Sequence, residues 1–159
     1  MALYVVDTNV ISYLVRLKGG HLRKDKERAR KYESLLQGNE IARAFPTAAE
    51  LQVWVHTMEE GDKKVQYTEG IHEIMEQTSM IDGDERVAQH WADIINAGLK
   101  AHRLHVHDGK NAKREAQLND TWIAACALAH GLTLVTDNRK DFDWMQDAVG
   151  LKMVCYSGA

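Results

Sequence analysis

The chain has 159 residues, of which 45% are hydrophobic and 27% are charged, and its formal net charge is -3. This size and composition predict one globular domain over residues 1–159 and leave little material for a second core. Because no cationic leader or long apolar run is visible, we expect a cytoplasmic protein with no membrane-bound part.

The first third of the chain predicts a strand followed directly by a helix. The apolar run LYVV at 3–6 is too short for a helix, and Asp7 opens the helical pattern VISYLVRL, which stops at Gly19. Residues 25–37 then carry apolar side chains on one face and predict a second, amphipathic helix.

A second strand and helix surround the only proline. IARAF at 41–45 is a strand candidate, and Pro46 follows it. Thr47 and Glu50 match a capping box, in which the glutamate reaches back to the backbone of the threonine, and this favours a helix from about 48 to 60.

The same alternation continues to the end of the sequence. Helical patterns cover 64–78, the segment that Asp84 introduces up to Leu99, and DTWIAACALAHG from Asp120; strand patterns cover Met80-Ile81, 132–136 and 151–156. Strands that alternate with helices predict an α/β fold, with a mainly parallel sheet between two layers of helices.

Acidic residues recur where the predicted strands end. Asp7 follows the first strand, Glu50 lies soon after the second, Asp120 begins a predicted helix, and Asp137, with Asn138 and Asp141, follows 132–136. Each has a structural alternative as a helix cap, a dipole partner or a turn residue. However, ligands of an open parallel sheet bind at the carboxyl edge, where all four segments would meet.

Carboxylates gathered at one edge repel one another unless a cation lies among them. Oxygen ligands without histidine or cysteine favour Mg2+ or Mn2+. Such a centre suits hydrolysis of a phosphodiester, because the metal activates water and stabilises charge on the phosphate.

Four segments of the chain occur together in one order: VVDTNVISYLV, PTAAEL, LNDTWIAACALAHGLTLVTDNRKDF and GLKMV. In this order and approximate spacing the sequence resembles PIN-domain ribonucleases, and among them the VapC-type toxins of type II toxin–antitoxin systems. It implies a PIN fold, Mg2+- or Mn2+-dependent endoribonuclease activity on RNA, a homodimer and inhibition by a cognate antitoxin.

The resemblance also assigns roles to residues. Asp7, Glu50 and Asp120 match the first three acidic positions. At the fourth, Asn138 takes the usual acidic position and Asp141 adds a carboxylate, whereas a one-residue shift would make Asp137 the ligand. The predicted metal ligands are thus Asp7, Glu50, Asp120 and Asp141, while Thr8, Asn9 and Thr136 order the site or have purely structural roles.

A basic stretch, RLKGGHLRKDKERARK at 16–31, follows the helix that Asp7 introduces. Such a run is commonly a solvated helix face, but beside an acidic cleft it would attract the RNA backbone. The residues predicted to bind RNA are Arg23, Lys24, Arg28 and Lys31.

Other interpretations have less support. The loop HRLHVHD, with His102, His105, His107 and Asp108, has irregular spacing for a transition-metal site and favours a solvated or RNA-contacting loop. Asn9 stands where an aspartyl phosphotransferase would carry its second aspartate. A non-catalytic PIN-like RNA-binding or scaffold protein remains the alternative. We expect both cysteines, Cys126 and Cys155, to be buried free thiols.

Overall fold

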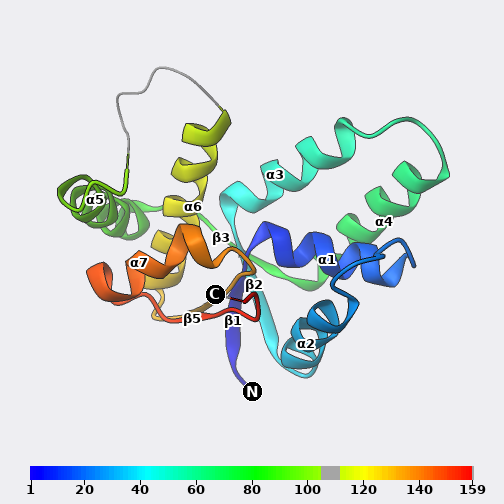
Figure 1. The fold of residues 1–159 in the computed structure, drawn as a ribbon, viewed down its shortest axis with the longest axis horizontal. Coiled ribbons are helices and arrows are strands. Elements are labelled where there is room, and N and C mark those ends of the chain that lie inside the picture. The colour runs from blue at the N-terminus through cyan, green and yellow to red at the C-terminus, as the bar shows by residue number, and fades with distance from the viewer. Residues whose placement is uncertain (105–111, 159) are drawn as a thin grey trace.

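A five-stranded parallel sheet forms the middle layer of this computed structural model (Figure 1). The structure describes residues 1–104 and 112–158, without the side chains of 112–116. The strands lie in the order β3-β2-β1-β4-β5. Their bounds are β1 Leu3–Val6, β2 Glu40–Ala44, β3 Ser79–Ile81, β4 Thr133–Val135 and β5 Met153–Val154.

Helices cover both faces of the sheet (Figure 1). Neighbouring residues of a strand point to opposite faces, so Val5 and Val6 of β1 enter different apolar clusters. The cluster around Val5 includes residues of α5 (Glu85–Lys100), α6 (Ala112–Ala129) and α7 (Arg139–Val149). The cluster around Val6 includes residues of α1 (Thr8–Lys18), α2 (Lys26–Leu36), α3 (Phe45–His56) and α4 (Asp62–Gln77). The prediction of a three-layer α/β fold is therefore confirmed.

Two predicted helix starts are wrong. Helix α3 begins at Phe45, directly after β2, with Pro46 in its first turn and no side-chain cap, so the capping box of Thr47 and Glu50 does not form. Helix α6 begins at Ala112, which places Asp120 inside the helix rather than at its N-terminus.

Helix α7 was absent from the predicted elements. Its buried residues Phe142 and Met145 lie three positions apart, and Gly150 ends it in the left-handed region with φ 73°. Helix α5 follows the prediction, since Asp84 Oδ1 accepts a 2.9 Å hydrogen bond from the Val87 N–H.

The cysteines and the lengths of the helices bear on two of the sequence predictions. Both cysteines are free; Cys126 is buried as expected, whereas Cys155 is half-buried. No helix in the described ranges is long and apolar enough to span a bilayer.

Candidate active site

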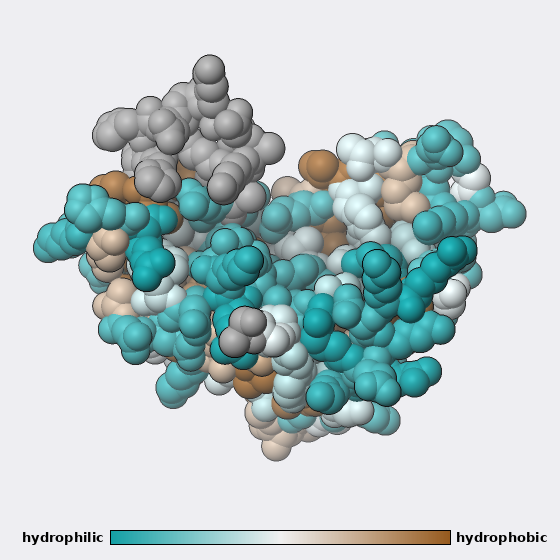
Figure 2. All heavy atoms as spheres, in the orientation of Figure 1, coloured by the Kyte–Doolittle hydropathy of each residue, from teal (hydrophilic) through white to brown (hydrophobic). Residues whose placement is uncertain are grey.

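The acidic residues meet in a cleft at the carboxyl ends of β1, β2 and β4. Figure 2 shows the surface hollowed between the two groups of helices, and the cleft has a volume of about 350 Å3. Its lining comes from the end of β1 and from α1, from α3, from α6 and from the start of α7: Asp7, Thr8, Asn9, Ser12, Arg16, Glu50, Trp54, Asp120, Asn138 and Asp141.

Asp7 is the most buried of these carboxylates, at 3% exposure. Its two oxygens accept hydrogen bonds of 2.7 Å, one from the Thr8 N–H at the start of α1 and one from the Thr136 hydroxyl. Burial nevertheless raises the pKa of Asp7 to about 6, and the charges of Glu50 and Asp141 add to the rise. The fold therefore holds this carboxylate in place by hydrogen bonds, and no described basic side chain pairs with it.

Glu50 lies on the α3 side of the cleft, where its Oε1 accepts a 2.8 Å hydrogen bond from the Thr8 hydroxyl. Burial raises its pKa, while hydrogen bonds from Thr8 and Asn119 oppose the rise. In the predicted capping box Glu50 would have bonded to the backbone N–H of Thr47. In the structure its carboxylate contacts Thr8 of α1 instead.

Asp120 reaches the cleft from the opposite side, on α6. Its pKa is raised to about 9, first by burial and then by the charges of Asp7, Asp141 and Glu50. Asp141 completes the set from the first turn of α7, where it accepts a hydrogen bond from the Asn138 side chain.

The donor set fits a hard divalent cation. No described Lys, Arg or His side chain forms an ion pair with Asp7, Glu50, Asp120 or Asp141. Within the described ranges, no three Asp, Glu, His or Cys side chains lie close enough together to coordinate a metal ion as they stand. The four carboxylates instead line a common cleft. Burial, and after it the charges of neighbouring carboxylates, raise the pKa values of Asp7 and Asp120. A divalent cation would relieve this repulsion, and oxygen ligands suit Mg2+ or Mn2+.

Asp137 points away from the cleft, although it lies between two residues that serve the site. Its side chain is 7% exposed and its Oδ1 lies 3.0 Å from Arg28 Nε. The structure therefore brings Asn138 and Asp141 to the cleft, and it leaves Asp137 and Arg28 paired with each other beside it.

Two of the residues expected to order the site, Asn9 and Thr136, form hydrogen bonds in the turns beside it. Asn9 Oδ1 accepts a 3.1 Å hydrogen bond from the Asp137 N–H. Thr136 Oγ1 accepts one of 3.1 Å from the Asn138 N–H while it donates to Asp7. These bonds join the turn after β1 to the turn after β4.

The sequence interpretation missed four residues at the site: Ser12, Arg16, Trp54 and Asn119. Helical spacing could have found three of them. Ser12 and Arg16 lie four and eight positions after Thr8 on α1, and Trp54 lies four after Glu50, so each shares a helix face with a residue already implicated.

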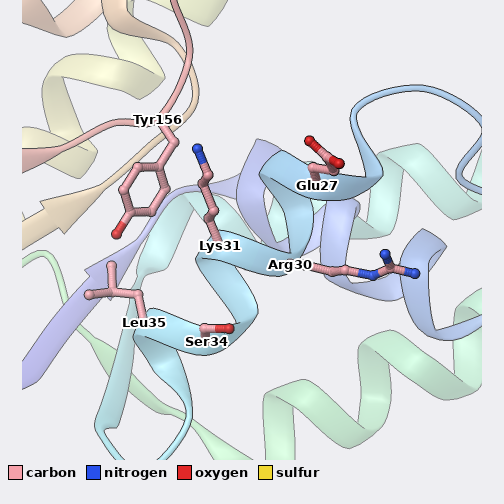
Figure 3. A pocket seen from close by; sticks show the side chains of 6 residues that line it. All are labelled: Glu27, Arg30, Lys31, Ser34, Leu35 and Tyr156. Carbon is pink, nitrogen blue, oxygen red and sulfur yellow. The ribbon is translucent and has the colours of Figure 1, made fainter.

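The predicted RNA-binding residues lie outside the cleft. Arg23 and Lys24 are exposed before α2. Lys31, on α2, lines a separate shallow pocket of about 510 Å3, where its side chain extends alongside the Tyr156 ring (Figure 3). Of the predicted histidine loop, His102 is exposed with φ 55°, whereas His105, His107 and Asp108 lie outside the described residues.

Comparisons with known proteins agree with this fold. The model of the PIN domain family matches residues 4–146. Ribonuclease VapC1 of Haemophilus influenzae strain R2866 is 26% identical over 145 residues, which cover 91% of this chain and 93% of the relative. The VapBC-1 structure from nontypeable Haemophilus influenzae contains a chain that is 25% identical, with a TM-score of 0.67 and coverage of 96% of this chain and 97% of that one. A chain of VapBC2 from Rickettsia felis, bound to a DNA fragment from its promoter, shares the fold at 22% identity, with a TM-score of 0.69 and coverage of 98% and 99%.

Proposed function

This chain belongs to the PIN-domain family, and we propose that its acidic cleft is the metal-dependent active site of an endoribonuclease. It is a ribonuclease of the VapC type, as its motifs predicted. The observation that carries the metal site is the meeting of Asp7, Glu50, Asp120 and Asp141 around one cleft with no basic partner among the described side chains.

A divalent cation on these four carboxylates would lower the pKa of a bound water and stabilise negative charge on the scissile phosphate. The protein's own contribution is to hold the ligands in place. Thr136 and the Thr8 N–H fix both oxygens of Asp7, the Thr8 hydroxyl fixes Glu50, and Asn138 fixes Asp141.

The substrate class that suits the cleft is RNA. Arg16 and Trp54 line the wall opposite Asp120, and the guanidinium of Arg16 lies 6.0 Å from the centre of the Trp54 ring. A cation contacts phosphate and an aromatic ring stacks on a base, so this wall suits a single strand.

Further contacts with the RNA backbone come from outside the cleft. A smaller pocket shares Asp120 and Asp141 with the cleft and adds Arg103, Lys140 and Trp144 on the far side of them. Exposed Arg23, Lys24 and Lys31 would extend this positive rim, whereas Arg28 is already paired with Asp137.

The protein partners follow from the same family. The solved relatives VapBC-1 and VapBC2 belong to toxin–antitoxin systems, which supports a cognate antitoxin as the inhibitor of this chain. We also propose a homodimer in the cytoplasm. Light scattering of the chain alone, and again with the product of the neighbouring gene, tests both assemblies.

The function is tested by incubating structured RNAs with the purified protein in Mg2+, in Mn2+ or in EDTA. We expect cleavage in either metal, none in EDTA, and a loss of at least ~100-fold for Asp7→Asn and Asp120→Asn. Asp147→Asn, an exposed carboxylate on α7, is the matched control. Binding of RNA without cleavage in any metal would favour the non-catalytic alternative.

A further inference from the structure

An ion pair joins α2 to the turn that follows β4. Arg28 Nε lies 3.0 Å from Asp137 Oδ1, and the exposed fractions of the two side chains are 27% and 7%. The Nε–H is not aligned as a hydrogen bond to this oxygen, so charge carries the contact. A second contact holds the same guanidinium, since Nη2 donates to the Tyr13 hydroxyl at 3.2 Å.

Tyr32 reinforces the same junction one helical turn further along α2. Its single hydroxyl proton lies between Asp137 Oδ1, at 2.6 Å, and the carbonyl oxygen of Thr136, at 3.0 Å. The hydroxyl oxygen accepts from the Tyr156 N–H at 2.9 Å, which ties the segment after β5 to the same point. The turn is thus held on its outer side by α2.

On its inner side, this turn forms hydrogen bonds to two of the candidate metal ligands. Thr136 donates to Asp7 at 2.7 Å, and the Asn138 side chain donates to Asp141. Asp137 lies between them with its side chain turned the opposite way. A movement of the backbone of this turn that released Asp137 from Arg28 would therefore move both neighbouring residues.

We propose that the Arg28–Asp137 pair is a positioning unit, which holds the 136–138 turn so that Thr136 and Asn138 keep Asp7 and Asp141 in place for the metal. This proposal rests on the proposed function. It gives Arg28 a role different from RNA contact, and Asp137 a role different from metal ligation. Because Asp137 is almost buried, removing its partner leaves an uncompensated charge that the turn must move to hydrate.

The test is a double-mutant cycle of Arg28→Gln, Asp137→Asn and the two together. Binding of Mn2+ to the metal-free protein is followed by electron paramagnetic resonance, and RNA cleavage is followed separately as kcat and KM. We expect each single variant to weaken Mn2+ binding roughly tenfold and to lower kcat with little change in KM, as outer contacts of metal ligands do. The double variant should be no worse than the worse single variant.

Controls separate positioning from general damage. Arg86→Gln on α5 and Asp147→Asn on α7 remove exposed charges and should leave Mn2+ binding unchanged. Arg28→Lys keeps the charge, and it should restore part of the Mn2+ affinity. Thermal unfolding shows that each variant is folded at the assay temperature, and a variant that is not folded is replaced by Asp137→Ser.

The outcomes are distinct. Unchanged Mn2+ affinity in the folded single variants, or additive losses in the double variant, would overturn the proposal. A rise in KM for Arg28→Gln with none for Asp137→Asn would overturn it in favour of RNA contact. If the wild type binds Mn2+ but cleaves no RNA, the proposed function fails, while the Mn2+ cycle still decides the role of the pair.

Discussion

The Thr8 hydroxyl donates a 2.8 Å hydrogen bond to Glu50 Oε1 across a sequence separation of 42 residues. The Thr47 hydroxyl oxygen lies 3.2 Å from the Thr8 hydroxyl oxygen. Because the Thr8 N–H also binds Asp7, this one residue contacts one carboxylate at the end of β1 and one on α3. Thr8 therefore sets the distance between the two halves of the candidate metal site.

Replacing Thr8 by valine keeps its shape and its backbone bond to Asp7 while it removes the bond to Glu50. We expect kcat to fall roughly tenfold, as for a lost outer contact of a metal ligand. The lost hydrogen bond, worth ~1 kcal/mol, should lower Tm by about 2–4 °C. Thr8→Ser should restore both, and Thr68→Val on exposed α4, where the hydroxyl bonds only to Lys64 O, is the control. Equal effects of the two valine variants would contradict this role.

The metal-free protein should lose stability as the pH rises. The pKa of Asp120 is raised from 3.8 to about 9 in the fold, so its protonated form is favoured there; its contribution is fully present below the unfolded pKa and is lost as pH rises through the folded one. We expect Tm in EDTA to fall by roughly 5 °C or more between about pH 5 and about pH 8.

Asp120→Asn should remove most of this pH dependence. For the wild type, added Mg2+ should raise Tm more at the higher pH, because the cation then meets the ionised carboxylates. Scanning calorimetry measures both effects. A variant that retains the wild-type slope would show that another group causes it.

Arg16 should contribute more to RNA binding than the predicted basic residues outside the cleft. Arg16→Gln keeps a polar side chain near Ser12 and removes the charge on the cleft wall. We expect KM to rise severalfold and the salt dependence of binding to decrease by about one phosphate contact, a slope change of ~0.7 for a single strand. Lys31→Gln should have a smaller effect, and titration of labelled RNA at several salt concentrations measures all three proteins. An equal salt slope for wild type and Arg16→Gln would contradict the assignment.

Gly98 of α5 lies so close to Leu104 and Trp144 that a side chain at this position would require those residues to move. A Cβ there would lie 2.4 Å from Leu104 Cδ1 and 2.9 Å from the Trp144 ring. We expect Gly98→Ala to destabilise the protein by about 1–3 kcal/mol in spite of the better helix propensity of alanine. Chemical denaturation tests this against Asn96→Ala, on the exposed side of the same helix. A gain in stability for Gly98→Ala would refute the contact.

The features predicted correctly from the sequence depend on local pattern. The run before Asp7 has the length and β-branching of a buried strand, and the helix opens directly after it, so Asp7 had to lie at a strand end. Parallel strands then bring their carboxyl ends together, which places Asp7 and the segment after β4 at one edge. Asp120 lines the same cleft although it lies inside α6 and not at a helix start.

The features that were mispredicted, or left open by the sequence, depend on partners far away in sequence. Glu50 matches a capping box locally, but the hydroxyl of Thr8 competes for its carboxylate. Asp137 and Asp141 could not be separated by motif, because the choice is made by Arg28 and Tyr32 on α2, more than a hundred residues earlier. A local pattern identifies candidates for a site, while tertiary contacts decide which way each side chain points.

The proposed active site requires that a divalent cation bound in the acidic cleft contacts the scissile phosphate of RNA. To examine this contact, one non-bridging oxygen of that phosphate is replaced with sulfur, at a cleavage position mapped beforehand, and single-turnover rates are compared in Mg2+ and Mn2+. Because Mg2+ binds sulfur poorly and Mn2+ accepts it, we expect one sulfur diastereomer to slow cleavage on the order of tenfold in Mg2+ and to recover in Mn2+. Equal slowing in both metals, for both diastereomers, would contradict a metal contact at the reacting phosphate.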